Sequence, residues 1–189
     1  MTAKRRKESP SQTAGPYVHI GCTPNFAGIT GVYDSDPGTV MISDSVIGER
    51  ITVTGTVFDG EGAPLTDALI EIWQADATGR FNATNNGFTG WGRCPADQET
   101  GAWRFDTIRP GVTGDGAAQI TFWIVARGIN VGLHTRMYFP DDPLLPSDPW
   151  LSLVENTRRD TLIAKQVADG HFQFNIHLQG PNETVFFDA

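Results

Sequence analysis

The side chains that could bind a metal ion or act as a nucleophile are few and lie far apart in the sequence. No two histidines have the spacing of a metal-ligand pair, so each is expected to form hydrogen bonds or to lie on the surface. They are His19, His134, His171 and His177. Neither cysteine has a recognisable activating partner nearby, and the chain contains no Ser/His/Asp grouping and no glycine loop that would cradle a phosphate. The sequence therefore predicts neither a metal site nor a catalytic nucleophile in this chain.

An arginine and a glycine-proline pair are the remaining candidates for contact with a ligand. Arg127 precedes Gly128 in a segment of turn residues, and Gly15 and Pro16 follow Thr13 in a stretch rich in Gly, Pro, Thr and Asp. The local pattern alone favours a solvated arginine and an ordinary turn. The other interpretation, that these residues line a binding site, requires evidence from outside the local pattern.

The balance of charge narrows the class of partner. The chain has 14 Lys and Arg residues and 22 Asp and Glu residues, which give a formal net charge of -8. A field of that sign repels nucleic acid and anionic membrane surfaces, so small molecules or another protein are the expected partners. The chain has only Cys22 and Cys94 and no apolar stretch of signal-peptide or membrane-spanning length. A cytoplasmic protein with two reduced thiols is therefore expected.

The elements that would position these residues are mainly strands. The chain contains 21 Gly and 12 Pro, and its apolar segments are short, which is typical of strands joined by turns. Residues 119–126 are apolar on both faces, a pattern that fits a strand covered on both sides. Turn residues 127–130 follow, and residues 133–139 are predicted to return as a hairpin partner. This hairpin is expected to form the spine of the core.

Further strands are predicted on both sides of the central hairpin. They are 49–59 and 68–75, which are expected to pair with each other, then 101–108, and a last hairpin of 161–167 and 172–178 that turns at 168–170. Residues 76–97 are predicted to form a long irregular loop. Ser147, Asp148 and Pro149 provide the start signals of one short helix.

The expected architecture is all-β: an antiparallel β-sandwich core with an extended N-terminal arm and one short helix. We assign residues 1–48 to the arm and residues 49–189 to the core, because the arm shows little hydrophobic periodicity. Within the arm, residues 13–20 are predicted to enter a short strand that packs on another surface. A chain of 189 residues forms a sufficient core without a second domain.

Several segments carry a resemblance to a known family. They are SQTAGPYVHIG, VFDGEG, IEIWQAD, TIRPG, ARGIN, LHTRMYF, TLIAK and ETVFFD, in order and with closely similar spacing between Ser9 and Asp188. In these segments the chain resembles the intradiol ring-cleavage dioxygenases, in particular the α chains of the heteromeric members. The resemblance implies a transthyretin-like β-sandwich core, a ferric ion site, and cleavage of a catechol between its two hydroxylated carbons with molecular oxygen.

The same resemblance implies that the iron ligands are missing from this chain. The family's iron is held by two tyrosines and a His-x-His pair, since a ferric ion favours anionic oxygen and imidazole ligands. The two histidine positions here contain Gln119 and Thr121, and Val112-Thr113 stands where one tyrosine is expected. The loop after the WQAD segment, where the other tyrosine belongs, contains none. The resemblance thus implies that Fe(3+) is bound by a partner β chain, and that this chain has no metal ligand and no catalytic residue.

In the heteromeric dioxygenases the α chain packs beside the β chain and helps to wall the substrate pocket. The matching segments here contain Thr13, Gly15 and Pro16, where backbone can approach a flat ring closely, and Arg127, whose guanidinium suits the charges of a dihydroxybenzoate. The resemblance therefore implies an αβ hetero-oligomer that acts on a small aromatic substrate and O2. Two alternatives remain. One is a non-catalytic transthyretin-like β-sandwich binding module, and the other is a homo-oligomeric dioxygenase with other iron ligands.

Overall fold

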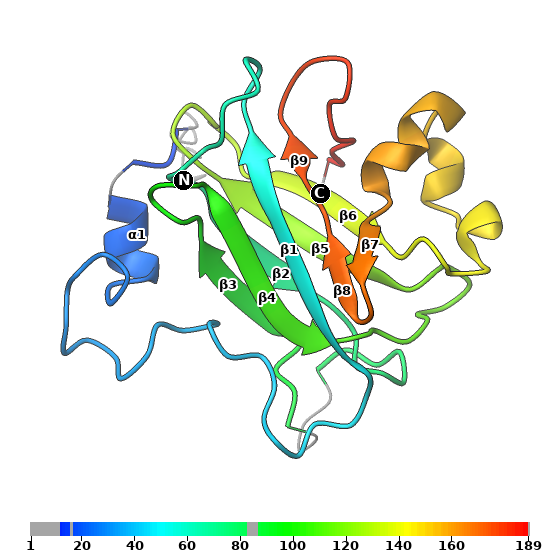
Figure 1. The fold of residues 1–189 in the computed structure, drawn as a ribbon, viewed down its shortest axis with the longest axis horizontal. Coiled ribbons are helices and arrows are strands. Elements are labelled where there is room, and N and C mark those ends of the chain that lie inside the picture. The colour runs from blue at the N-terminus through cyan, green and yellow to red at the C-terminus, as the bar shows by residue number, and fades with distance from the viewer. Residues whose placement is uncertain (1–11, 16, 83–86, 189) are drawn as a thin grey trace, which may run out of the picture.

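Two β-sheets stacked face to face form the body of the protein (Figure 1). The computed structural model describes residues 12–15, 17–82 and 87–188. One sheet has the strand order β4-β1-β8-β7, with β9 also paired to β1, and the other has the order β3-β2-β5-β6. The predicted all-β sandwich is confirmed. The first sheet is mixed, because β1 is antiparallel to β4 but parallel to β8 and β9.

Along the described chain, helix α1 precedes six consecutive strands, and three 3-10 helices separate these from the last three strands. The strands are β1 (Arg50–Phe58), β2 (Leu69–Trp73), β3 (Trp91–Pro95), β4 (Ala102–Ile108), β5 (Gln119–Val125), β6 (Leu133–Tyr138), β7 (Lys165–Ala168), β8 (His171–Gln173) and β9 (Ile176–His177). The helical segments are α1 (Tyr17–Cys22) and the 3-10 helices η1 (Leu145–Ser147), η2 (Leu151–Leu153) and η3 (Asn156–Leu162). In the part of the chain that the structure describes, none of the helices has the length and apolarity needed to cross a membrane.

The predicted central hairpin is confirmed, since β5 and β6 pair in antiparallel register over most of their length. Ile120, Phe122 and Ile124 of β5 are fully buried between the two sheets. The alternate residues of β5, among them Thr121 and Trp123, remain partly exposed. The expectation of a strand covered on both sides is therefore only partly met, and one face of β5 belongs to the outer surface of its sheet.

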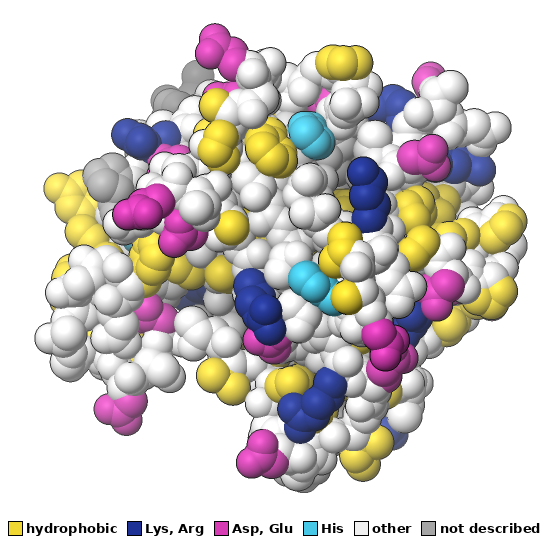
Figure 2. Space-filling view, viewed as in Figure 1, with side chains coloured by type: hydrophobic (Ala, Val, Ile, Leu, Met, Phe, Trp, Pro, Cys, Tyr) yellow, Lys and Arg dark blue, Asp and Glu magenta, His cyan; other side chains and the backbone are white. Residues whose placement is uncertain are grey.

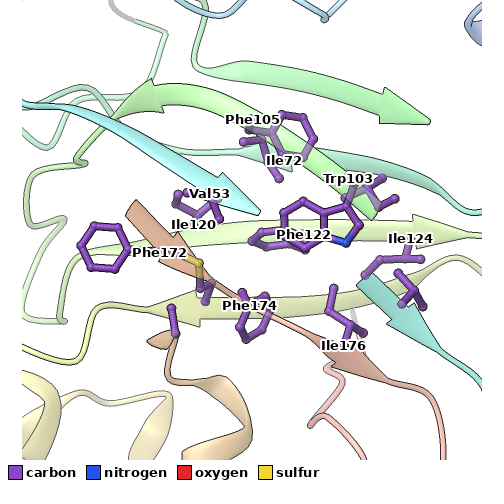
Figure 3. Close-up of a cluster of buried hydrophobic side chains, with 14 of the residues drawn as sticks. Val53, Ile72, Trp103, Phe105, Ile120, Phe122, Ile124, Phe172, Phe174 and Ile176 are labelled. Carbon is purple, nitrogen blue, oxygen red and sulfur yellow. The ribbon is translucent and has the colours of Figure 1, made fainter. Parts of the chain in front are cut away.

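Aromatic rings from both sheets meet in the core (Figure 3). The ring centroid of Phe122 lies 5.5 Å from that of Trp103 on β4 and 5.3 Å from that of Phe174. Because side chains alternate between the faces of a strand, each strand directs one apolar row inward. Burial of these rows supplies the main favourable contribution to folding and joins the two sheets.

The predicted pairing of the first two strands is wrong. β1 lies in one sheet beside β4 and the C-terminal strands, whereas β2 lies in the other sheet between β3 and β5. Each strand presents one apolar face, and that pattern fits two strands that face each other across a core as well as two strands that pair side by side. The arrangement is decided by segments much later in the chain, which supply the neighbours of each strand.

The short strand predicted within residues 13–20 is also wrong, because the chain forms helix α1 there. The backbone amide of Val18 donates to the carbonyl of Gly15 at 3.0 Å, and the amide of Thr23 donates to the carbonyl of His19 at 2.8 Å. These local hydrogen bonds satisfy backbone groups that a strand would leave for a neighbouring strand. A sequence pattern of β-prone residues does not reveal whether such a neighbour exists.

The short helix predicted after Pro149 forms as 3-10 turns instead of an α-helix. Oδ1 of Asp148 accepts hydrogen bonds from the backbone amides of Trp150 at 2.9 Å and Leu151 at 2.8 Å, but η2 begins only at Leu151, two residues later than Pro149 predicts. The chain becomes extended again at Val154, so η2 ends after one turn. The Asp148 side chain thus stabilises the turn that precedes η2 but does not determine how far the helix continues.

Strand β3 lies within the segment predicted to be an irregular loop. A side chain at Gly92 would collide with Met41, a residue of the N-terminal segment that is buried in the core. The glycine therefore serves close packing, although glycine within a sequence normally argues against a strand. β3 pairs along its whole length with β2, from Leu69↔Pro95 to Trp73↔Trp91.

We expect Phe122→Ala to lower the free energy of unfolding by about 3–5 kcal/mol, because it removes a ring of β5 that packs across the core against Trp103 and Phe174. Urea unfolding followed by tryptophan fluorescence measures the change. Phe81→Ala is the matched control, since Phe81 is 41% exposed and its removal should change stability by less than about 0.5 kcal/mol. Equal losses in both variants would contradict the placement of Phe122 in the core.

Candidate functional site

The outer faces of the two sheets differ in chemical character. The outer face of the β4-β1-β8-β7 sheet is mostly polar, as Figure 2 shows, and β1 presents Thr52 and Thr54 on it. The outer face of the other sheet carries Trp73 of β2, which is 42% exposed, and the partly exposed Trp123 of β5. Aromatic side chains that remain open to solvent mark the second face as a candidate contact surface.

The N-terminal segment lies against one end of this second face and forms two neighbouring clefts with it. The first cleft, of about 550 Å³, lies between Thr13 and side chains of the sheet that include Trp123. The second cleft, of about 350 Å³, has in its wall Gly15, His19, Asp67 and Arg127. The fold therefore brings the predicted site residues of the N-terminal segment and of the β5–β6 turn to one place.

Thr13 attaches the N-terminal segment to the end of β5. Its Oγ1 accepts a hydrogen bond from the backbone amide of Gly128 at 2.7 Å and lies 3.3 Å from the carbonyl oxygen of Ala126, to which it can donate. At Gly15, an added Cβ would meet no atom within 4 Å, so the space beside this backbone is open. Pro16, the fourth predicted site residue, lies outside the described residues. The role of all four in substrate binding stays a prediction.

Arg127 is held at one edge of its guanidinium and open at the other. Its Nε lies 2.5 Å from Oδ2 of Asp67. The Arg127 side chain is 75% exposed, whereas that of Asp67 is 25% exposed. Within the described residues, no hydrogen bond engages the terminal amino groups of Arg127. The sequence does not predict a role for Asp67, because its contact with Arg127 depends on the pairing of β2 with β5 and no local motif indicates it.

His19 links helix α1 to the same segment. Its Nε2 lies 3.1 Å from the backbone carbonyl oxygen of Asp67, and its ring centroid lies 5.7 Å from that of Phe26. Nδ1 of His19 is buried and has no hydrogen-bond partner among the described residues. The sequence prediction of a hydrogen-bonding histidine agrees with this position, although its place beside the cleft was not foreseen.

The outer face of β5 does not offer the donor set that a ferric ion requires. Gln119 and Thr121 project from the same face, and Oγ1 of Thr121 lies 3.4 Å from Oε1 of Gln119, to which it can donate a weak hydrogen bond. Both groups are neutral oxygen donors, whereas a hard trivalent cation favours anionic ligands. In the described part of the chain, no three His, Cys, Asp or Glu side chains gather closely enough to hold a metal ion.

Tyr138, the one tyrosine within the sandwich, cannot replace a missing phenolate ligand. The side chain is fully buried, and its hydroxyl donates to Oδ1 of Asp148 at 3.1 Å. Burial, together with the negative charge of Asp148, raises the pKa of Tyr138 far above its ordinary value. The hydroxyl therefore stays protonated and acts as a structural donor. The residues present here do not fit a ferric ion.

Comparisons with known proteins identify the family. A family model described as Dioxygenase matches residues 22–180. The protocatechuate 3,4-dioxygenase alpha chain of Pseudomonas putida is 42% identical over 194 residues, which cover 96% of this chain and 96% of that one. This chain belongs to the intradiol ring-cleavage dioxygenase family. Intradiol dioxygenases are, in general, iron enzymes.

Two further matches are a beta chain and a solved dioxygenase domain. The protocatechuate 3,4-dioxygenase beta chain of Burkholderia cepacia is 38% identical over 160 residues, covering 73% of this chain and 68% of that one. The solved dioxygenase domain from Streptomyces sp. SirexAA-E superposes with a TM-score of 0.60 at 24% identity, covering 94% of this chain and all of that domain. The second match establishes the likeness of fold alone.

We expect Thr13→Val to release the N-terminal segment from the β5–β6 turn, because the amide of Gly128 then loses its acceptor. Loss of one such hydrogen bond, worth about 1 kcal/mol, corresponds to roughly fivefold faster hydrogen exchange at Gly128. Exchange measured by NMR tests this. Thr52→Val is the control. The hydroxyl of Thr52 donates to Asp106 within the other sheet, so its loss should leave hydrogen exchange at Gly128 unaffected. Unchanged exchange at Gly128 in Thr13→Val would rule out the attachment.

Proposed function

We propose that this chain is the α subunit of a protocatechuate 3,4-dioxygenase. The assembled enzyme uses O2 to cleave 3,4-dihydroxybenzoate between its two hydroxylated carbons, which gives 3-carboxy-cis,cis-muconate, a step of aromatic catabolism. The observation that carries this proposal is the 42% identity to an alpha chain over 96% of both chains. The partner is a β subunit, because the family includes beta chains that are homologous to this chain.

We assign the Fe(3+) of the assembly to the β subunit. Support comes from the neutral Gln119 and Thr121 on the outer face of β5 and from the protonated, buried Tyr138. Neither arrangement supplies the anionic oxygen ligands that a ferric ion favours. The iron supplies the redox chemistry of ring cleavage, and this chain contributes no ligand to it.

The contribution of this chain is to the wall of the substrate pocket. Gly15 presents open backbone that a flat ring can approach, and Thr13, two residues before it, is held by the hydrogen bond from the amide of Gly128. Arg127 presents a permanent positive charge at the mouth of the same cleft. Pro16 belongs to this wall by its place in the matching segment. Together these groups exclude water from one side of the bound 3,4-dihydroxybenzoate and orient its negatively charged groups.

The N-terminal segment also offers a surface for the β subunit. No residue of the six-residue helix α1 is buried, and Tyr17 is 79% exposed. A helix of this length is unstable by itself, so it needs packing from outside. The partner subunit supplies that packing in the αβ protomer. Both cysteines are free, which suits our further proposal of a reducing, cytoplasmic location.

We expect ring-cleavage activity only when this chain is combined with its β subunit. Oxygen uptake with 3,4-dihydroxybenzoate measures it for the α chain alone, for the β chain alone and for the co-expressed pair. The α chain alone should show none, since its residues do not fit the metal. If the co-purified pair is inactive, the alternative interpretation as a non-catalytic binding module gains support.

We expect Arg127→Ala in the co-expressed complex to raise KM or lower kcat by about tenfold, which corresponds to roughly 1.4 kcal/mol, with iron content unchanged. The reason is loss of a charge that faces the substrate. Arg104→Ala provides the control, because Arg104 is exposed on the outer face of the opposite sheet and pairs with Asp106. Kinetics equal to those of the unmodified complex would remove Arg127 from the site.

A further inference from the structure

We propose that Asp67 is a positioning residue for substrate binding. It holds the guanidinium of Arg127 by Nε, so that the terminal amino groups face the negative charge of the substrate. This inference rests on the proposed function and deepens it. The contact itself is a single short ion pair, with 2.5 Å between Nε of Arg127 and Oδ2 of Asp67.

The strand register places the two side chains opposite each other. β2 and β5 are antiparallel, and Leu69 lies opposite Val125. Two residues beyond this pair, Asp67 lies across from Arg127 on the same face of the sheet, because side chains alternate with a period of two. The pairing is thus dictated by the same ladder that builds the core.

Buried neighbours fix the backbone on both sides of the pair. Ala68, next to Asp67, is completely buried, and Ala126, next to Arg127, is 1% exposed. The backbone amide of Arg127 also lies 3.4 Å from Oδ2 of Asp67, so the carboxylate oxygen faces both groups of the same residue. The Asp67 carboxylate is therefore held in place, and it restrains the side chain of Arg127.

This geometry leaves the other edge of the guanidinium available. An arginine has five N–H donors in a planar fork, and the bond at Nε uses one of them. The terminal groups of Arg127 remain exposed at the cleft. A free arginine would sample many rotamers, and ordering it on binding would oppose affinity, whereas a restrained fork loses less freedom.

The negative charge of Asp67 opposes the binding of an anionic substrate, whereas its positioning of Arg127 favours binding. The direction of the change in KM on removal of Asp67 therefore tests the proposal. The carboxylate offsets part of the attraction between Arg127 and an anionic substrate. Exposed ion pairs interact weakly in water, while a correctly oriented two-point contact with an oxyanion is strong and directional. We infer that positioning outweighs the offset of charge, so that removal of Asp67 raises KM.

Two features of the structure allow the side-chain role to be isolated. The backbone carbonyl of Asp67 is the group that lies 3.1 Å from Nε2 of His19. A change of the Asp67 side chain therefore leaves the link to helix α1 in place. Asparagine at this position keeps an oxygen that can accept from Nε of Arg127 but lacks the charge, so it should retain part of the positioning.

The test uses the co-expressed αβ complex and steady-state kinetics with 3,4-dihydroxybenzoate. We expect Asp67→Ala to raise KM about fivefold to tenfold and Asp67→Asn about twofold, with kcat changed less than about twofold and iron content retained. In an Arg127→Ala background, Asp67→Ala should produce no further rise in KM, because both changes remove one shared interaction. Glu183→Ala, which breaks the ion pair with Arg158, is the matched control and should leave KM unchanged.

Several outcomes would overturn the inference. A lower KM in Asp67→Ala would mean that the charge offset dominates, and a rise that persists in the Arg127→Ala background would mean that Asp67 acts through the fold. If Arg127→Ala raises KM but Asp67→Ala does not, positioning by Asp67 fails while the proposed function stands. If the complex of unmodified chains lacks ring-cleavage activity, the proposed function fails and the role of Asp67 falls with it.

Discussion

The antiparallel ladder between β2 and β5 is the interaction on which the rest of the structure depends. It joins two strands at the centre of the β3-β2-β5-β6 sheet and directs Ile72 and Phe122 into the core. Because side chains alternate, the same register sends Trp73 and Thr121 to the outer face. A slip of one residue would exchange core and outer surface, so the register is strongly determined by burial. Core packing and the geometry of the candidate site are therefore consequences of one pairing.

The division between the two faces explains how a fold can be kept while its chemistry changes. The inward row of β5 is buried and tightly packed, so substitutions there would cost stability. The outward row carries Gln119 and Thr121, whose replacement leaves the core untouched. A dioxygenase sandwich can thus lose its metal-binding side chains and remain folded. In the function that we propose, the residues near the turn after β5, above all Arg127, serve a pocket whose reactive centre is supplied by another chain.

Much of the fold could be predicted because it depends on local alternation of apolar residues. The β5–β6 hairpin follows from the apolar run at 119–126 and the turn residues after it. Predictions failed where long-range neighbours decide. The placement of β1 and β2 in different sheets depends on the C-terminal strands. Gly92 makes β3 difficult to predict, because the glycine argues against a strand locally but is needed where Met41 packs against it. The β-prone residues at 13–20 predict a strand where the chain forms helix α1 (Tyr17–Cys22) for a similar reason, since propensity cannot reveal the absence of a partner strand.

The candidate site was predictable only in part. The resemblance to the family singled out four residues, Thr13, Gly15, Pro16 and Arg127. Of these, the structure brings Thr13, Gly15 and Arg127 to two neighbouring clefts, and Gly15 lines both. Asp67 and His19 carry no local signal, since their contacts with Arg127 and with the backbone of residue 67 arise from strand register and from the course of the N-terminal segment. Sequence patterns identify groups with suitable chemistry, whereas the partners that orient them emerge only from tertiary structure.

The central claim is that the metal is held by another polypeptide, and locating the iron tests it most directly. Crystals of the αβ complex, measured at the iron absorption edge, give an anomalous difference map that marks each iron atom. We expect a peak for each αβ pair, surrounded by side chains of the β subunit, and no peak near Gln119 or Thr121. An iron peak coordinated by residues of this chain would contradict the account.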